Sequence, residues 1–163
     1  MRIFLLLTVF LLTSCGFHLR GHSGAEMQFA TLYLDAPNTG SPFIEDLRRS
    51  LEANKVKLTN TAEQADVVLN IVSEFPEKQI LTLGGSGRVN EFQLRYRVSL
   101  RAYDLKGRVW IAAEEMVQRR DYYYDDAKVL AKEAEEILLY QSMRSDMVQQ
   151  IVRRLSRAKP QLQ

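Results

Sequence analysis

One residue of the chain, Cys15, has both the chemistry and the surroundings of a modification site. It is the single cysteine among 163 residues, so no disulfide within the chain can use its thiol. As a thiolate, cysteine is a strong nucleophile that can take up an acyl or alkyl group. The small side chains of Thr13 and Ser14 stand directly before it and leave the backbone open to a peptidase. We therefore expect cleavage before Cys15 and attachment of a lipid to its sulfur.

The residues ahead of Cys15 follow the pattern of a secretory signal peptide. Arg2 supplies a positive charge, and residues 3–12 form an uncharged, mostly apolar run. This run is about half as long as the roughly 20 residues that span a bilayer, which favours a signal over a permanent anchor. It ends in Leu12-Thr13-Ser14-Cys15, which resembles the lipobox of bacterial lipoproteins. We expect a mature N-terminus that carries N-acyl and S-diacylglycerol groups, because two or more chains give stable attachment.

The position after the cysteine predicts a location. Gly16 stands there, in place of the aspartate that often marks retention in the inner membrane, so we expect the inner leaflet of the outer membrane, facing the periplasm. The predicted organisation is a cleaved signal peptide (1–14), a lipid anchor and tether (15–28), one α+β domain (29–157) and a C-terminal tail (158–163).

The remaining candidates for chemistry do not form a catalytic site. His18 and His22 are the two histidines, both lie in the tether, and Glu26 is the carboxylate nearest to them, so we expect no metal site. The chain contains no Gly-x-Ser-x-Gly elbow. We predict that the protein is not an enzyme and has no cofactor apart from the covalent lipid. Lys+Arg is 22 against 20 for Asp+Glu without a basic block, which argues against a nucleic-acid partner.

Helical spacing marks two segments. Ser41-Pro42 provides an N-cap and a first helical residue, and the apolar residues that follow predict a helix to about Asn54. A long helix is predicted over 127–157. Its two apolar stripes are both expected to pack on a sheet (Val129, Leu130, Ala134, Ile137 and Leu138; Met147, Val148, Ile151, Val152 and Leu155).

Strand patterns fill the space between the two helices. Strands are expected at 29–34, 56–59 and 66–75, with Pro76 ending the third, and again at 79–83 and 92–101, with a return strand at 108–119. The expected fold is α+β: a two-layer sandwich in which a small, twisted, mostly antiparallel sheet is covered on one face by two helices.

Two groups of residues are candidates for a partner interface. Arg95, Arg97 and Arg101 alternate with apolar residues on one strand, so they share its polar face. That face is either solvated or prepared for a polar or acidic partner. The three consecutive tyrosines cannot all enter one core, and an outward tyrosine is a common interface anchor (Tyr122, Tyr123 and Tyr124). The alternative for them is aromatic packing at a strand end.

The mature N-terminus, Cys15-Gly16-Phe17-His18-Leu19-Arg20, resembles the start of the lipopolysaccharide-assembly lipoprotein family LptE, also called rare lipoprotein B. Glu91-Phe92-Gln93-Leu94 is similar to a strand opening in that family, and Leu130-Ala131-Lys132 is similar to the head of its long helix. Length, order of elements and lipobox agree along nearly all of the chain.

The resemblance implies a function and a partner. The family forms a plug-and-barrel complex with the outer-membrane barrel protein LptD, helps that barrel to fold, and assists insertion of lipopolysaccharide into the outer leaflet. It also implies that Lys132 and, displaced by a few positions, Arg88 contact lipopolysaccharide. Two alternatives remain at this stage: an outer-membrane lipoprotein that serves as adaptor in another envelope-assembly complex, and a soluble lipid carrier with an enclosed cavity.

Overall fold

The computed structural model describes residues 27–161. The predicted signal peptide (1–14), Cys15 and nearly all of the predicted tether lie outside the described residues, as do residues 162–163. The elements follow one another in this order: β1 (Thr31–Asp35), α2 (Pro42–Ala53), β2 (Lys57–Leu58), the 3-10 turn η1 (Ala62–Gln64), β3 (Val67–Leu83), β4 (Val89–Tyr103), β5 (Val109–Tyr123), the 3-10 turn η2 (Asp126–Lys128) and α3 (Val129–Arg157).

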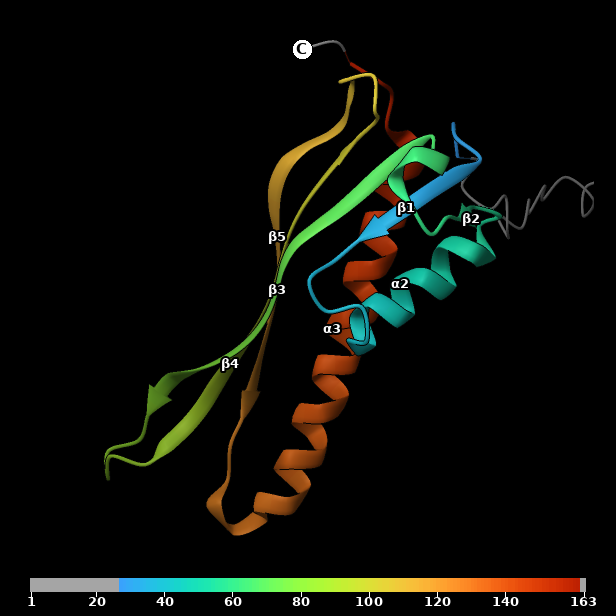
Figure 1. The fold of residues 1–163 in the computed structure, drawn as a ribbon. Coiled ribbons are helices and arrows are strands. Elements are labelled where there is room, and N and C mark those ends of the chain that lie inside the picture. The colour runs from blue at the N-terminus through green and yellow to red at the C-terminus, as the bar shows by residue number, and fades with distance from the viewer. Residues whose placement is uncertain (1–26, 162–163) are drawn as a thin grey trace, which may run out of the picture.

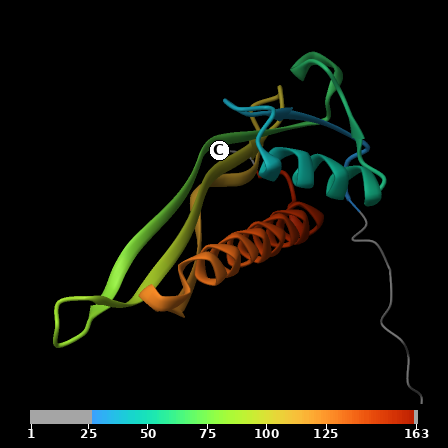
Figure 2. The same cartoon turned by 90° about the horizontal axis from the view of Figure 1, so that it is seen from below.

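The strands form one sheet in the order β2-β1-β3-β4-β5, and both helices pack on the same side of it (Figures 1 and 2). The long β3–β4 and β4–β5 ladders are antiparallel, whereas the short β1 runs parallel to both β2 and β3. The predicted α+β fold with two helices on one face is therefore confirmed, with a sheet that is mixed. Among residues 27–161, no element covers the opposite face of β3–β5 (Figure 2).

Helix α2 begins where the sequence predicts. The Ser41 hydroxyl accepts a hydrogen bond from the Ile44 amide at 3.1 Å, and Pro42 takes the first helical position. These two residues satisfy or remove amide donors that a helix start leaves without a partner. The apolar side of α2 is buried against the sheet and α3 (Phe43, Ile44, Leu47 and Leu51).

Helix α3 is one continuous helix whose two halves differ in burial. The second stripe is fully buried and, together with Met143, forms the centre of the core (Met147, Val148, Ile151, Val152 and Leu155). Burial of each such side chain away from water stabilises the folded state by roughly 1.5–3 kcal/mol. The prediction for the first stripe is wrong, since Val129, Leu130, Ile137 and Leu138 are exposed. In this half, the helix turns a different side towards the sheet, which carries Glu136, Leu139 and Tyr140.

Strand β3 does not end at Pro76, contrary to the prediction. The strand continues to Leu83, and Pro76 lies opposite Tyr96 in the antiparallel ladder with β4. Pairing of β3 with β1 stops at Asn70. Beyond that point β3 has a neighbour on one side only, so a missing amide hydrogen at Pro76 breaks no bond to a second strand.

The turn between β4 and β5 is held by a buried carboxylate. Asp104 accepts hydrogen bonds from the amides of Lys106 and Arg108, from Arg108 Nε and from Trp110 Nε1, over distances of 2.8–3.2 Å. Burial alone raises the pKa of Asp104, but these donors lower it below its ordinary value. Gly107 has φ +79°, a conformation that suits glycine.

The described part of the predicted tail is fixed to the sheet. Gln161 and Val109 exchange two backbone hydrogen bonds of 2.9 Å each, and Ala158 is buried. The tail therefore adds a short β-bridge at the start of β5 and brings the C-terminal end of α3 close to Trp110.

Candidate functional site

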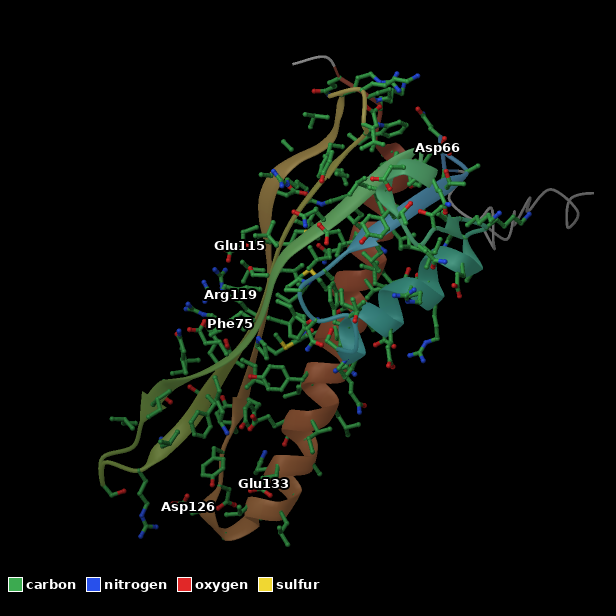
Figure 3. All side chains as sticks on the ribbon, in the orientation of Figure 1. Asp66, Phe75, Glu115, Arg119, Asp126 and Glu133 are labelled. Carbon is green, nitrogen blue, oxygen red and sulfur yellow. The ribbon has the colours of Figure 1, made fainter. Side chains whose placement is uncertain are left out.

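The domain is elongated, and we distinguish its two ends (Figures 1 and 2). We call residues 79–91 and 122–138 the distal end; it contains the β3–β4 loop and the start of α3. We call residues 27–30, 104–111 and 153–161 the proximal end, from which the chain leads back towards Cys15. Figure 3 places Asp126 and Glu133 at the distal end and Asp66 near the proximal end.

Arg88 closes the β3–β4 loop at the distal end. Its carbonyl accepts a hydrogen bond from the Gly84 amide at 2.7 Å. The Arg88 side chain is exposed and has no hydrogen-bonding or salt-bridge partner among residues 27–161. An unpaired guanidinium at a loop tip can bind a phosphate or a carboxylate through two parallel hydrogen bonds.

Lys132 lies in the first turns of α3, at the same end of the molecule. Its ammonium forms a salt bridge with Glu135 at 2.7 Å, and 19% of its side chain is exposed. A ligand that binds the Lys132 ammonium must therefore compete with Glu135. The structure thus places Arg88 and Lys132 at one end, on separate elements, with no hydrogen bond or salt bridge between them.

A cluster that the sequence did not reveal ties α3 to the sheet at the distal end. Lys78 of β3 contacts Glu136 of α3 at 2.6 Å, and the Tyr122 hydroxyl donates to the same carboxylate at 2.7 Å. The Lys78 ammonium also lies 4.1 Å from the centre of the Phe92 ring, over which it makes a cation–π contact. These residues are far apart in sequence, so only the fold brings them together.

Two members of this cluster, Lys78 and Tyr122, each keep one protonation state near neutral pH. Burial lowers the pKa of Lys78, but hydrogen bonds to Glu136 and Tyr122 leave that pKa above its ordinary value. Burial, with the hydrogen bond to Glu136, raises the pKa of Tyr122 to about 12. Lys78 is therefore charged and Tyr122 neutral under physiological conditions, and the cluster is a structural tie.

The three tyrosines point in different directions. Tyr122 is buried, Tyr124 is half-buried and packs edge-on against Phe92 with ring centres 5.1 Å apart, and Tyr123 is 73% exposed. Tyr123 thus remains the candidate anchor for a partner. It belongs to an apolar rim at the distal end, which also includes Leu130, 82% exposed, and several residues of the hairpin and α3 (Ile80, Leu81, Leu83, Ile137 and Leu138).

The uncovered sheet face carries the predicted arginines. Arg97 lies between the carboxylates of Glu77 and Glu115, at 3.6 Å from each, and above the Phe75 ring. Figure 3 shows Phe75, Glu115 and Arg119 on the side of the sheet away from the helices. Arg101 donates to Asn70 at 3.1 Å.

The same face contains a cross-strand pair of like charges. Arg95 of β4 is directly opposite Arg119 of β5 in the ladder, and like charges in that position are destabilising. Arg95 donates to Gln93 at 2.8 Å, and neither guanidinium has a carboxylate partner within residues 27–161. Arg119 was missed in the sequence, although the alternation of the return strand could have placed it on this face.

The described residues contain no group of three or more histidine, cysteine or acidic side chains able to hold a metal ion. Nor does any helix within 27–161 have the length and hydropathy to cross a membrane. What the geometry offers is recognition: an exposed cation and an apolar rim at the distal end, and an arginine-bearing sheet face.

Comparison with known proteins gives a consistent result. The family described as LptE, lipopolysaccharide-assembly, matches residues 29–155. An LPS-assembly lipoprotein LptE from Pectobacterium atrosepticum is 30% identical over 150 residues, which are 91% of this chain and 80% of the relative.

Solved structures of lipoproteins share the fold. The solution structure of uncharacterized lipoprotein B from Nitrosomonas europaea is 40% identical, with a TM-score of 0.74 over 86% of this chain and 90% of that one. The crystal structure of the rare lipoprotein B from Shewanella oneidensis is 28% identical, with a TM-score of 0.66 over 75% of this chain and 90% of that one.

Proposed function

Because the chain belongs to the LptE lipopolysaccharide-assembly family, we propose that it is an outer-membrane lipoprotein that plugs the LptD barrel, helps it to assemble and assists lipopolysaccharide insertion. A role in lipopolysaccharide assembly follows from the family. Occupation of the LptD lumen, anchoring through acylated Cys15 in the inner leaflet and contact with lipopolysaccharide are the finer parts of the proposal.

The observation that carries the proposal is the extent of the family match. It runs from residue 29 to residue 155 and so includes α2, the five strands, nearly all of α3 and the whole distal end. A match limited to the signal peptide and lipobox would support only a generic lipoprotein.

The shape of the domain suits a plug. Strand β3 has 17 residues and is therefore roughly 55 Å long, which exceeds the height of the apolar band of an outer-membrane barrel, about 25 Å. The uncovered face of β4 and β5 is polar, as the lining of a wide barrel lumen is. An elongated domain whose uncovered sheet face carries charged side chains can meet such a lumen wall through hydrogen bonds and ion pairs.

Copurification tests the proposal. The tagged, full-length protein is recovered from detergent-solubilised outer membranes, and a stoichiometric, heat-modifiable barrel of LptD size is expected with it. Recovery of the lipidated protein alone, or with an unrelated complex, would contradict the plug function and favour the adaptor alternative. A Cys15→Ala variant tests the anchoring separately from the binding to LptD, since it removes the lipid attachment site and leaves every residue of the domain in place.

A further inference from the structure

A basic depression lies at the proximal end, away from Arg88 and Lys132. It has a volume of about 430 Å³ and opens between the start of β5 and the last turns of α3. Three arginines of α3 and two apolar residues of β5 line it (Arg153, Arg154, Arg157, Trp110 and Ile111). Figure 1 shows this end of α3 beside the β4–β5 turn, at the opposite end from the β3–β4 loop.

Two of the three arginines have free charges. Arg154 forms a salt bridge with Glu114, which also lines the depression. Arg153 and Arg157 are exposed and have no salt bridge among residues 27–161. A position near a helix C-terminus favours basic residues by itself, but it does not explain an indole and an aliphatic side chain beside them. Guanidinium groups beside a tryptophan suit a phosphate at a membrane interface.

The path of the chain brings this depression near the membrane. Phe29, at the start of the domain, packs edge-on against Trp110 with ring centres 5.5 Å apart. Residues 16–28 are all that separate Phe29 from Cys15, and even a fully extended link of this length reaches at most about 50 Å. If Cys15 is acylated as proposed above, the depression is held within that distance of the leaflet.

We propose that the depression docks the phosphate of an anionic phospholipid in the leaflet that holds the lipid anchor. Arg153 and Arg157 bind the phosphate, and Trp110 lies at the level of the headgroups. The inference rests on the proposed anchoring through Cys15. Docking would fix the proximal end at the leaflet and direct the distal end away from it, which a tether alone cannot do.

Trp110 is the single tryptophan of the chain and reports directly on docking. The lipidated, full-length mature protein is reconstituted in vesicles of phosphatidylethanolamine with either phosphatidylglycerol or phosphatidylcholine. Vesicles of either composition also contain a phospholipid with a nitroxide near its headgroup, and this nitroxide quenches nearby indole fluorescence. Strong quenching is expected with phosphatidylglycerol and weak quenching with phosphatidylcholine.

Removal of the Arg153 and Arg157 charges should abolish most of the quenching in phosphatidylglycerol vesicles. Each basic side chain near an anionic surface favours the docked state about fivefold, so Arg153→Gln/Arg157→Gln should lower the docked-to-undocked ratio roughly 30-fold. Arg153→Lys/Arg157→Lys should retain most of the quenching. The matched control, Arg48→Gln/Arg49→Gln, removes two exposed charges from α2 and should quench like the parent.

The outcomes separate the two proposals. Protein that fails to float with either kind of vesicle contradicts the anchoring. If the protein floats, three results overturn the docking. They are an absence of quenching, equal quenching in the phosphatidylglycerol and phosphatidylcholine vesicles, and equal quenching in the parent and in Arg153→Gln/Arg157→Gln. Unchanged near-UV circular dichroism of that variant would show that its Phe29–Trp110 packing is intact, so a loss of quenching would then support docking.

Discussion

A single charge reversal, Arg119→Glu, is expected to make the free protein slightly more stable and at the same time to prevent recovery of the LptD barrel. In the ladder, residue 119 lies directly opposite Arg95 and, on the edge strand β5, faces no second strand, so the change replaces a repulsive cross-strand pair with an attractive one. Such a pair contributes about 0.2–1 kcal/mol, which corresponds to a rise in Tm of about 1–3 °C for a domain of this size.

The same substitution is expected to weaken the complex with the barrel. Two arginines that repel each other on an uncovered face are best explained by an acidic surface on the partner. Placing a glutamate against such a surface costs several kcal/mol; about 3 kcal/mol weakens binding roughly 100-fold. Quantitative copurification and thermal unfolding measure the two effects, and Arg48→Glu on α2 is the control. Full recovery of the barrel with Arg119→Glu would show that this face does not meet the partner.

The second large effect is expected at the distal end. Arg88→Ala/Lys132→Ala should bind lipopolysaccharide roughly 100-fold more weakly at low salt, because each contact between a cation and a phosphate contributes about 1.5–3 kcal/mol. Arg88→Ala alone should account for more of the loss than Lys132→Ala alone. The reason is that Arg88 is unpaired among the described residues, whereas Lys132 already contacts Glu135 at 2.7 Å.

A variant with the opposite effect sharpens this test. Glu135→Gln removes the carboxylate that competes for Lys132 and should therefore tighten binding. Binding to purified lipopolysaccharide is measured for each variant at low and at raised salt, since screening should reduce the differences. Arg48→Ala/Arg49→Ala removes the same number of charges elsewhere. Parent-like affinity of the Arg88→Ala/Lys132→Ala protein at low salt would exclude these residues as the contact.

Local patterns in the sequence were sufficient to predict most of the fold. The Ser41-Pro42 start, the alternation from Phe92 to Leu100 and the stripe from Met147 to Leu155 each depend on neighbours within a few residues, and the structure bears them out. Pro76 misled the prediction because its effect depends on whether β3 has a second neighbour there. That neighbour, β1, is set by parallel pairing between distant segments.

The candidate site was less predictable for the same reason. Apolar spacing alone could not show that Leu130, Ile137 and Leu138 stay exposed, since an interface stripe and a core stripe have the same period. The tie between Lys78 and Glu136 joins residues 58 positions apart. Among the residues singled out as interface candidates, Arg101 and Tyr123 are exposed whereas Tyr122 is buried, and their roles remain predictions.

The most direct test of the central claim is site-specific photo-crosslinking in cells. A photoreactive phenylalanine derivative replaces Tyr123, which is 73% exposed at the distal end, or, as control, Leu105, which is 59% exposed at the proximal end. If the distal end occupies the barrel, the probe at position 123 will form an adduct with LptD and the probe at position 105 will not. A lipidated, stable protein whose probe at 123 labels no barrel, or labels only a different protein, would contradict the account.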